Sequence, residues 1–453
     1  MATAALTATA KHAARNSLSR AAATAVGRRN IMMAMAADDE DIPGLPDPMT
    51  LASMSTLKSS GNISSSKVGG LNIVTDDGSS SSSVLFTLKN AGGSAAELSG
   101  EAGAAAVNAY LTYKSSSTAS TLKTLRDMNN SGAQPYPMLP SKASRTSAQF
   151  GYTCAPEHTA DLVANLAMDC AYTKWDVQDA VNYANIAAST ALACPANVCE
   201  ESIYVAAYGD ASSMSNSVYC SNAISRDVVA SFREREYYGA ASADAVLVAT
   251  GVADHDAFVA AVTAAFGTKE GASSTPLKGE YRGGESRVPV EGASKTYLRL
   301  AFAAPYCALV QDIIVATLQA QGVEAFAQDG VLGVSGDANV ASTSELVDTL
   351  VAALAAPITA ESAAKGKLLA KASALMALEG TSSTSLAQSL TTGAVLGTEA
   401  YTPQDLAAAY DDIAVETVVA EAAKMKESVL AVSAVGGGLA AVPYHPTLAA
   451  MFK

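Results

Sequence analysis

The segment 91–114 (AGGSAAELSGEAGAAAVNAYLTYK) constrains the fold most, because it leads from a strand into a helix through a glycine-rich turn. Just before it, Val84, Phe86 and Leu88 alternate with Leu85, Thr87 and Lys89, which predicts a strand. Glycines in the turn allow a tight backbone path and a close approach of the helix. An alanine-rich helix is predicted over residues 101–113. We therefore expect this helix to pack closely against the chain around it.

This predicted helix lacks the side chains of a helix-borne zinc site. Such a site needs two imidazoles one turn apart, together with a carboxylate that deprotonates the bound water. The chain has four histidines, and no two of them lie within ninety residues of each other: His12, His158, His255 and His445. No helix can therefore present a histidine pair, and the alanines and tyrosine of this helix predict a packing role.

The composition favours a helix-rich chain with more than one domain. A length of 453 residues is enough for two or more domains with sizeable cores. Apolar residues make up 49% but aromatic residues only 6%, so we expect many closely packed, alanine-rich helices. The formal charge of −14 argues against a nucleic-acid groove. No charge-free run of 18 apolar residues occurs, so no membrane-spanning helix is predicted.

Residues 1–37 differ from the rest of the chain. They contain five basic residues, no acidic residue and many alanines, serines and threonines. This make-up is typical of a mitochondrial or plastid transit peptide, and a disordered basic tail is the alternative. The chain turns acidic at Asp38, and residues 38–63 are predicted to be an acidic, serine-rich spacer.

The six cysteines are sparse and irregularly spaced, and only Cys194 and Cys199 lie close together in the sequence. With no second pair and no histidine nearby, they do not form a zinc-knuckle pattern. In a reducing compartment we expect buried or free thiols. A redox role for this pair is the alternative.

The order of predicted elements repeats along the chain. In the first part, strands are expected at 71–74, 84–88, 136–139, 148–153 and 245–250, and helices at 101–113, 118–128, 157–170, 175–192, 197–208, 226–237 and 254–266. In the second, strands are expected at 295–302, 331–335 and 429–434, and helices at 308–321, 344–355, 360–380, 384–391, 403–410 and 415–425. The segment 267–280, rich in Gly, Ser, Lys and Pro, is predicted to be a linker. Two α+β domains are therefore predicted, at 64–266 and 281–453.

Several single residues carry structural expectations. Trp175, the only tryptophan, is expected to anchor the core at a helix start. Glu97 is expected to serve as a charge partner for a helix N-terminus. His255 should cap its helix or bond backbone locally. Arg282 and Arg287, on either side of a glutamate, either pair across a domain or subunit boundary or lie on a solvated face. The serines lack a nearby histidine in the sequence, so no Ser–His nucleophile is predicted.

The chain resembles the mitochondrial-processing-peptidase and pitrilysin family over about residues 64 to 448. The resemblance is carried by Gly92-Gly93-Ser94 with Glu97, by YRGGESR at 281–287, by Tyr401-Thr-Pro403, and by the Gly-Gly to Pro-Tyr ending at 437–444. In that family the glycine turn leads into a helix bearing H-x-x-E-H. With Tyr113-Lys114 as the anchor of the alignment, these five positions fall on Ala106, Val107, Asn108, Ala109 and Tyr110. The family's third ligand would fall near Ala187.

The resemblance implies two related α/β-roll domains of the processing-peptidase type, each a mainly antiparallel sheet packed with helices. Within the family it points to the non-catalytic core subunits of the cytochrome b-c1 complex (complex III), of the core protein 2 type. These would be peripheral on the matrix side of the mitochondrial inner membrane, without metal, cofactor, nucleic acid or peptidase activity. The implied partners are a core protein 1-type subunit, cytochrome b, cytochrome c1 and the Rieske protein in a dimeric respiratory complex.

Two other functions remain open at this stage. One is a non-catalytic presequence-binding subunit of a mitochondrial processing peptidase. The long glycine-rich loop that the resemblance implies for such a subunit is missing between Phe302 and Ser335, although a strongly acidic chain could steer basic peptides. The other is an independent metalloprotease, which would have to bind zinc.

Overall fold

A computed structural model describes residues 62–116, 119–136, 144–163, 170–219, 224–238, 245–266, 279–379, 383–396 and 403–452. All of them belong to one compact unit that spans residues 60–453. The predicted transit peptide at 1–37 and nearly all of the predicted spacer at 38–63 lie outside the described residues, as does most of the predicted linker at 267–280.

The first sheet has six strands in the spatial order β1-β2-β6-β3-β5-β4. Only β2 and β6 run parallel, with Leu71 opposite Ala245, and the other neighbours are antiparallel. Every residue of β3 and β6 is buried, which explains why these central strands read as nearly continuous apolar runs. The strands are β1 (Ile63–Val68), β2 (Leu71–Asp76), β3 (Ser82–Leu88), β4 (Gln134–Tyr136), β5 (Ala148–Cys154) and β6 (Ala245–Thr250).

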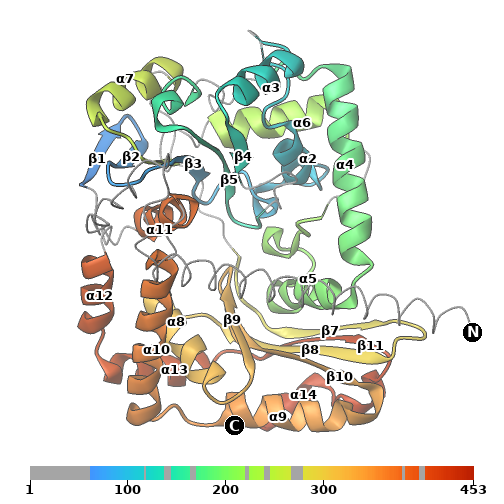
Figure 1. The fold of residues 1–453 in the computed structure, drawn as a ribbon. Helices are drawn as coiled ribbons and strands as arrows, with labels where there is room; N and C mark the ends of the chain where they lie inside the picture. The colour runs from blue at the N-terminus through green and yellow to red at the C-terminus, as the bar shows by residue number, and fades with distance from the viewer. Residues whose placement is uncertain are drawn as a thin grey trace, which may run out of the picture. The chain divides into compact units, whose positions relative to one another are not determined.

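Helices of the first half surround this sheet (Figure 1). A large apolar cluster joins one face of the sheet to α2, α3, α6 and α7. The helices are α2 (Ala104–Leu111), α3 (Thr121–Asn130), α4 (Lys174–Leu192), α5 (Pro195–Tyr208), α6 (Arg226–Arg233), which continues as a π-helical turn at Glu234–Tyr238, and α7 (His255–Phe266), with short 3₁₀ turns at Ser94–Ala96, Pro156–His158 and Ser213–Ser215.

The second sheet has five strands in the order β7-β11-β8-β10-β9, and again only one pair, β7 and β11, is parallel. The expected α+β class with two mainly antiparallel sheets is therefore confirmed. The strands are β7 (Gly284–Pro289), β8 (Lys295–Ala303), β9 (Glu324–Gln328), β10 (Val331–Asn339) and β11 (Ala431–Gly436). The helices are α8 (Ala308–Gln319), α9 (Thr343–Ala355), α10 (Ala360–Glu379), α11 (Ser383–Leu396), α12 (Pro403–Asp412), α13 (Val415–Met425) and α14 (His445–Ala450), with 3₁₀ turns at Val340–Ser342 and Leu439–Ala441.

Each sheet is covered on one face by a helix from the other half of the chain. Helix α5 packs on β7, β8 and β11 of the second sheet, and α11 packs on β3 and β6 of the first (Figure 1). Ile203 and Ala207 of α5 share an apolar cluster with Ala301 and Ala431. Each half of the chain therefore contributes one helix that packs on the sheet of the other half.

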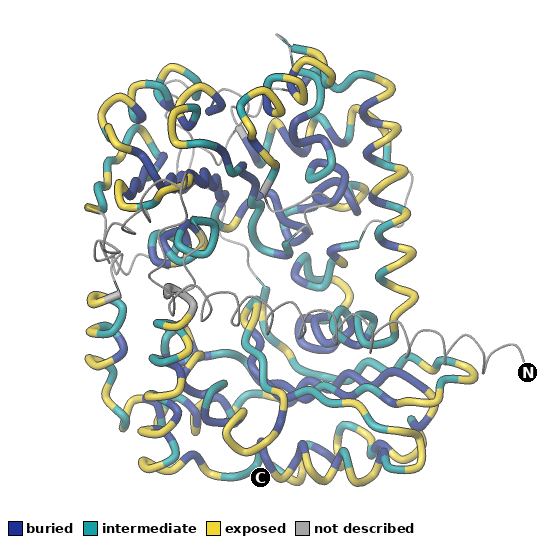
Figure 2. Tube along the Cα trace, viewed as in Figure 1, coloured by how far each residue is buried: buried dark blue, intermediate teal, exposed yellow. Residues whose placement is uncertain are grey.

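The largest disagreement with the sequence-based expectation concerns Trp175, which is 73% exposed rather than buried in the core. It does stand at the start of α4, but the inward face of that helix carries Val177, Ala180, Ala184 and Ala188. Trp175 lies two residues before Val177, so the 3.6-residue period of a helix turns its side chain away from this face. Figure 2 shows exposed residues following the outer side of α4.

Some elements differ from the predicted ones. Strands β1, β7 and β9 and helix α14 were not predicted. The three strands lie at the edges of their sheets and contain no fully buried residue. The predicted helix at 157–170 is only a 3₁₀ turn at Pro156–His158 followed by turns, and residues 164–169 lie outside the described residues. The strand expected at 136–139 overlaps the observed β4 (Gln134–Tyr136) only at Tyr136, and residues 137–139 lie outside the described residues.

The helices of the described residues can be compared with the length and hydropathy of a membrane span. No single helix among them is both long and apolar enough to cross a membrane. One pair, Val340–Ala355 with Ala360–Met376, meets the length and composition limits together but is bent by 100° at its break.

Candidate functional site

The glycine turn before α2 packs directly on a neighbouring backbone segment. Gly92 has a φ of +74°, and a Cβ on Gly93 would clash with the carbonyl of Arg145. The backbone N–H groups of Ser94 and Ala95 donate to the carbonyls of Ser144 (3.1 Å) and Arg145 (2.9 Å). The turn therefore requires glycine both for its conformation and for this close approach.

Glu97 closes the turn onto the start of α2. Its carboxylate, 4% exposed, accepts hydrogen bonds from the backbone N–H groups of Gly103 (3.0 Å) and Ala105 (2.8 Å). The expected role as a helix N-terminal partner is confirmed. Burial raises the pKa of Glu97 to about 7, although the two backbone donors oppose the shift.

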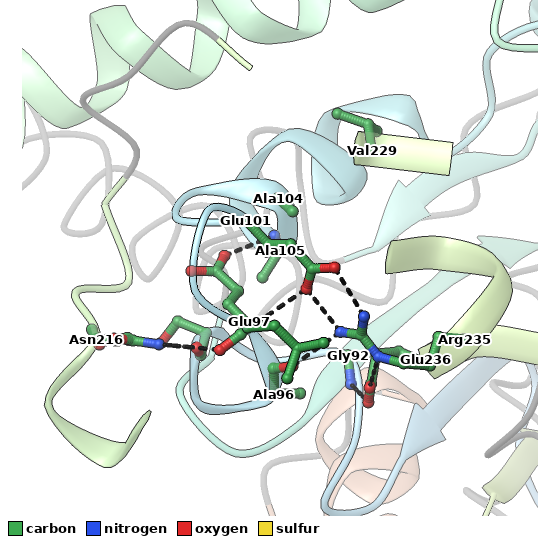
Figure 3. Close-up of polar contacts among 12 residues, drawn as sticks. Gly92, Ala96, Glu97, Glu101, Ala104, Ala105, Asn216, Val229, Arg235 and Glu236 are labelled. Atoms are coloured by element: carbon green, nitrogen blue, oxygen red, sulfur yellow. Dashed lines mark hydrogen bonds and ion pairs between the residues drawn. The ribbon is translucent and has the colours of Figure 1, made fainter. Parts of the chain in front are cut away.

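A second carboxylate in the same loop is paired with a cation. Glu101 receives two hydrogen bonds of 2.7 Å from the guanidinium of Arg235, which also reaches Glu236 (2.9 Å) and the carbonyl of Ala96 (3.0 Å). The bonds from Arg235 lower the pKa of Glu101. Figure 3 shows Arg235 directed at both glutamates, so the loop before α2 is tied to the π-helical turn that follows α6.

Small side chains of α2 line a shallow hollow beside β5. Ala105, Ala109 and Thr112, at helical spacing, border it with Phe150 and Tyr237, and its volume is about 20 Å³. This volume holds about one water molecule. The side chains that line it include no imidazole, carboxylate or thiol, so they offer none of the usual zinc ligands.

The other aligned positions of α2 face different neighbours. Ala106 and Val107 belong to an apolar cluster with Val177 and Ala180 of α4. Tyr110 is half-buried at the edge of this cluster, and its ring centroid lies 6.2 Å from that of Tyr183. These side chains pack α2 against α4.

Asn108 stands where the resemblance would place an inner position of the motif, and it is fully buried. Its Nδ2 donates to the carbonyls of Ala104 (2.9 Å) and Val229 (3.3 Å), which fixes α2 to α6. Its Oδ1 has no hydrogen-bond partner. An amide held in this way cannot act as a general base, because it does not take up a proton near neutral pH.

The described residues contain no group of three or more His, Cys, Asp or Glu side chains arranged to hold a metal ion. Ala187, aligned with the family's third ligand, lies within α4 and carries no donor atom.

Cys194 and Cys199 differ in burial. Cys194 is exposed before α5, whereas Cys199 is buried, and its Sγ lies 3.3 Å from the Oγ of Ser433 in β11. Both are free thiols. Cys220 lies outside the described residues.

The hydrogen bonds of His255 differ from two expectations: that it caps its helix or bonds local backbone, and that no serine lies near a histidine. Its ring bonds two side chains instead of local backbone, with Nε2 2.6 Å from Ser66 Oγ and Nδ1 2.7 Å from Thr75 Oγ1. The N-terminal cap of α7 comes from Asp254, which accepts from the backbone N–H of Ala257 (3.0 Å). A serine and a histidine thus do meet. The third group is a threonine hydroxyl, however, which cannot stabilise an imidazolium as the carboxylate of a catalytic triad does.

The two arginines near 285 have different roles. Arg287 pairs with Glu285 and donates to the carbonyls of Leu439 (3.0 Å) and Pro443 (2.7 Å), so it holds β7 to the C-terminal segment within the second half. Arg282 is exposed, 3.9 Å from the carboxylate of Glu280. Arg287 therefore does not cross between the halves, and Arg282 lies on a solvated face.

A cavity that sequence analysis missed lies where α5 meets the β9–β10 turn. Its volume is about 140 Å³, and it is lined by Ser144, Arg145, Glu200, Glu201, Tyr204, Val218, Gln328 and Asp329. Arg145, 1% exposed, lies 3.0 Å from Glu201 and 3.8 Å from Asp329 and covers the ring of Tyr204 at 3.9 Å. An isolated arginine has no signature in the sequence, so only the fold reveals that it is buried among acids.

Comparison with known proteins identifies the fold. No family model and no curated protein sequence matches this chain. Its structure is similar to a chain from complex III2 of Candida albicans with Inz-5 bound, at a TM-score of 0.70 and 15% sequence identity. The match covers 86% of this chain and 100% of that chain. The two chains share a fold. In all, 191 chains of solved structures are similar, so the fold by itself does not select one function.

Proposed function

We propose that this chain is a non-catalytic core subunit of complex III, of the core protein 2 type. The observation that carries the proposal is the fold similarity, which extends over the whole length of a chain from complex III2. The resemblance in sequence at 92–97 and 281–287 points to the same assembly.

The residues of α2 support a structural role over peptide hydrolysis. Zinc-dependent hydrolysis needs imidazole ligands and a base beside the metal. The aligned imidazole positions carry Ala106 and Tyr110 instead, the aligned base position carries Ala109, and the buried amide of Asn108 bonds α2 to α6. These side chains can stabilise the helix packing, but none of them supplies an imidazole ligand or a carboxylate base for the reaction.

The proposal includes a location and an organisation. Residues 1–37 would be a mitochondrial transit peptide followed by the spacer at 38–63, and domains at 64–266 and 281–453 would be joined by the linker at 267–280. The subunit would lie peripherally on the matrix side of the inner membrane. It would contact a core protein 1-type subunit, cytochrome b, cytochrome c1 and the Rieske protein, and other chains would carry out electron transfer.

A native-gel experiment tests the proposal. The full chain, tagged at its C-terminus, would be expressed in its own cells, and mitochondria would be solubilised in a mild detergent. We expect the tag to migrate with cytochrome b and depletion of the chain to lower the amount of assembled complex. Migration of the tag apart from cytochrome b, with complex levels unchanged on depletion, would contradict the proposal.

A second candidate, presequence binding for a processing peptidase, is favoured by the cavity beside α5. Glu200, Glu201 and Asp329 line it. Arg145 lies 3.0 Å from Glu201 and 3.8 Å from Asp329, and Arg299 lies 3.5 Å from Glu200, so three carboxylates face two guanidinium groups and one negative charge is left over. Carboxylates in a half-enclosed site would attract a basic side chain of a peptide. Cleavage of a presequence peptide by a zinc-bearing partner, with and without this chain, tests it. Stimulation that is lost in Glu200→Gln/Asp329→Asn but retained in Asp127→Asn would favour this candidate over the scaffold.

A further inference from the structure

Three of the exposed apolar side chains of the first half lie where α3 and α4 begin. Leu122 is 79% exposed and Leu125 is 42% exposed on α3, and Trp175 stands at the start of α4. A buried aspartate, Asp176, brings the two helix starts together, because its carboxylate accepts from Thr121 (3.0 Å) and Ser115 (2.5 Å). We call these two helix starts, with Leu122, Leu125, Trp175 and the basic residues described next, the α3–α4 patch.

Basic side chains surround the apolar ones in this patch. Lys123 and Arg126 are exposed on α3, between and beside the two leucines. Lys174 lies 5.6 Å from the centre of the Trp175 ring. Burial acts to raise the pKa of the Asp176 carboxyl, but the hydroxyl groups that donate to it and the nearby Lys114 together lower this pKa.

The acidic side chains of the patch only partly offset these charges. Asp176 is buried and accepts hydrogen bonds from hydroxyl groups, and Asp127 lies 3.6 Å from Arg126. Asp179, exposed one turn further along α4, is the remaining acid on these two helix starts. Four basic residues therefore face two exposed acids, in a chain whose formal charge is −14.

We propose that the α3–α4 patch binds an anionic lipid surface. Leucine and tryptophan flanked by lysine and arginine suit the boundary between headgroups and acyl chains, where the apolar side chains insert and the cations remain at the headgroups. Electrostatics selects the orientation, because a strongly acidic protein is repelled by an anionic surface unless a locally positive region faces it. This interaction goes beyond the proposed scaffold function and does not depend on it.

The favoured occupant is a lipid surface rather than an acidic protein segment. Three apolar side chains stand out from two helix ends among the cations, and insertion into a bilayer needs no matching groove on the protein. Asp179, one turn away on α4, limits the insertion to the helix starts. An absence of vesicle binding would exclude a lipid surface as the occupant.

Vesicle flotation tests the proposal with the full chain. Because residues 1–37 are basic and could bind membranes themselves, all variants would carry Gln at the five positions Lys11, Arg15, Arg20, Arg28 and Arg29. The probe is phosphatidylcholine vesicles with and without cardiolipin, at low and high salt. We expect binding only to the cardiolipin vesicles, weakened by salt.

Two patch variants and one control decide the outcome. Leu122→Ser/Trp175→Ser should weaken binding about tenfold or more, since affinity scales with buried apolar area. Lys123→Gln/Arg126→Gln should weaken it about fivefold for each charge removed. The control, Leu368→Ser/Met376→Ser, removes two side chains of similar exposure from α10 and should bind like the parent. No binding by the parent, or equal binding by all variants with unchanged circular dichroism, would overturn the proposal.

Discussion

Helix α5 leaves the first half to cover the second sheet, and helix α11 leaves the second half to cover the first sheet. We call these contacts the α5 seam and the α11 seam. Their positions in the two halves correspond, but their chemistry differs. The α5 seam contains a buried arginine, carboxylates, hydroxyls and a thiol, whereas the α11 seam contains apolar side chains and a few hydroxyls.

The α5 seam is bonded along its whole length. At the start of the helix, Ser433 Oγ donates to the carbonyl of Cys199 (2.9 Å) and lies 2.6 Å from Ser202 Oγ. At its end, the Tyr208 hydroxyl donates to the carbonyl of Asp329 (2.7 Å), and the N–H of Arg282 donates to the carbonyl of Ala207 (2.8 Å).

The α11 seam depends on burial. Ala387 and Leu390 share an apolar cluster with Val74, Leu85 and Val248 of the first sheet. At the first residue of the helix, Ser383 Oγ lies 2.7 Å from Ser83 Oγ and 2.9 Å from Ser81 Oγ. The difference suggests that the same packing arrangement can be stabilised either by a polar network or by apolar burial, with different sensitivity to mutation.

The largest expected effect comes from Arg145→Met. Removing this cation leaves Glu201 and Asp329 without it at the edge of the α5 seam, and breaking a buried ion pair from one side costs about 3–5 kcal/mol. Urea unfolding would measure the loss. Arg126→Met, which removes an exposed arginine, should change the free energy of unfolding by less than about 0.5 kcal/mol. A loss no larger than the control's would show that the charged network does not stabilise the seam.

Truncation of the apolar residue at the centre of each seam is the next test. Ile203 and Leu390 are both almost completely buried, so Ile203→Ala and Leu390→Ala should each cost about 2–5 kcal/mol. Hydrogen exchange would locate the damage. We expect Leu390→Ala to expose mainly α11, whereas Ile203→Ala should leave α5 more protected, because its polar contacts remain. Equal loss of protection in both helices would remove the proposed distinction between the seams.

A buried carboxyl without a cation extends the comparison away from the seams. Because the pKa of Glu97 is raised to about 7, the folded state holds this proton more tightly than the unfolded chain, so its contribution to stability is present below pH 4.5 and is lost as the pH rises to about 7. The loss would be about 3 kcal/mol at most. Glu97→Gln should remove this slope from the pH dependence of unfolding.

Glu101 provides the matched control, since its pKa shift has the opposite sign. Arg235 lowers the pKa of Glu101, so its contribution is present above the ordinary carboxyl pKa and is lost as the pH falls. Glu101→Gln should therefore destabilise the protein more at pH 7 than at pH 4. The same slope for both variants would contradict the assignment of an uncompensated carboxyl at Glu97.

The sequence predicted the central strands and most helices because their patterns are local. Strands β3, β6 and β8 contain apolar runs that can be recognised from the local sequence alone. The role of Glu97 followed from its position before an alanine-rich helix. Edge strand β1 (ISSSKV) has only two apolar residues, so its sequence carries no strong signal. Trp175 was misplaced because its size favours burial, whereas the helical phase set by Val177 and Ala180 decides its direction.

The seams could not be predicted from the same patterns. The apolar face of α5 indicates that the helix is buried, but it does not say that the sheet it covers belongs to the other half of the chain. Arg145 forms ion pairs with Glu201 and Asp329, which lie 56 and 184 residues further along the chain, so only folding brings these side chains together. The shallow hollow beside α2 likewise depends on Tyr237 and Phe150 meeting Ala105. The absence of a histidine pair, by contrast, could be read directly from the sequence.

The smallest expected effects come from one serine in each seam. Ser383→Ala should cost about 1 kcal/mol, because its hydroxyl bonds are partly open to water and Ser81 and Ser83 can bond to solvent instead. Ser433→Ala should cost more, about 1–3 kcal/mol, since Ser433 is fully buried and its loss leaves the carbonyl of Cys199 and the hydroxyl of Ser202 without this partner. Thermal unfolding measures both beside the control Ser342→Ala, a half-buried serine whose hydroxyl forms an exposed hydrogen bond to the carbonyl of Asn339. If Ser383→Ala proved the more harmful, the polar network of the α5 seam would not be what distinguishes it, and apolar burial would have to account for both seams.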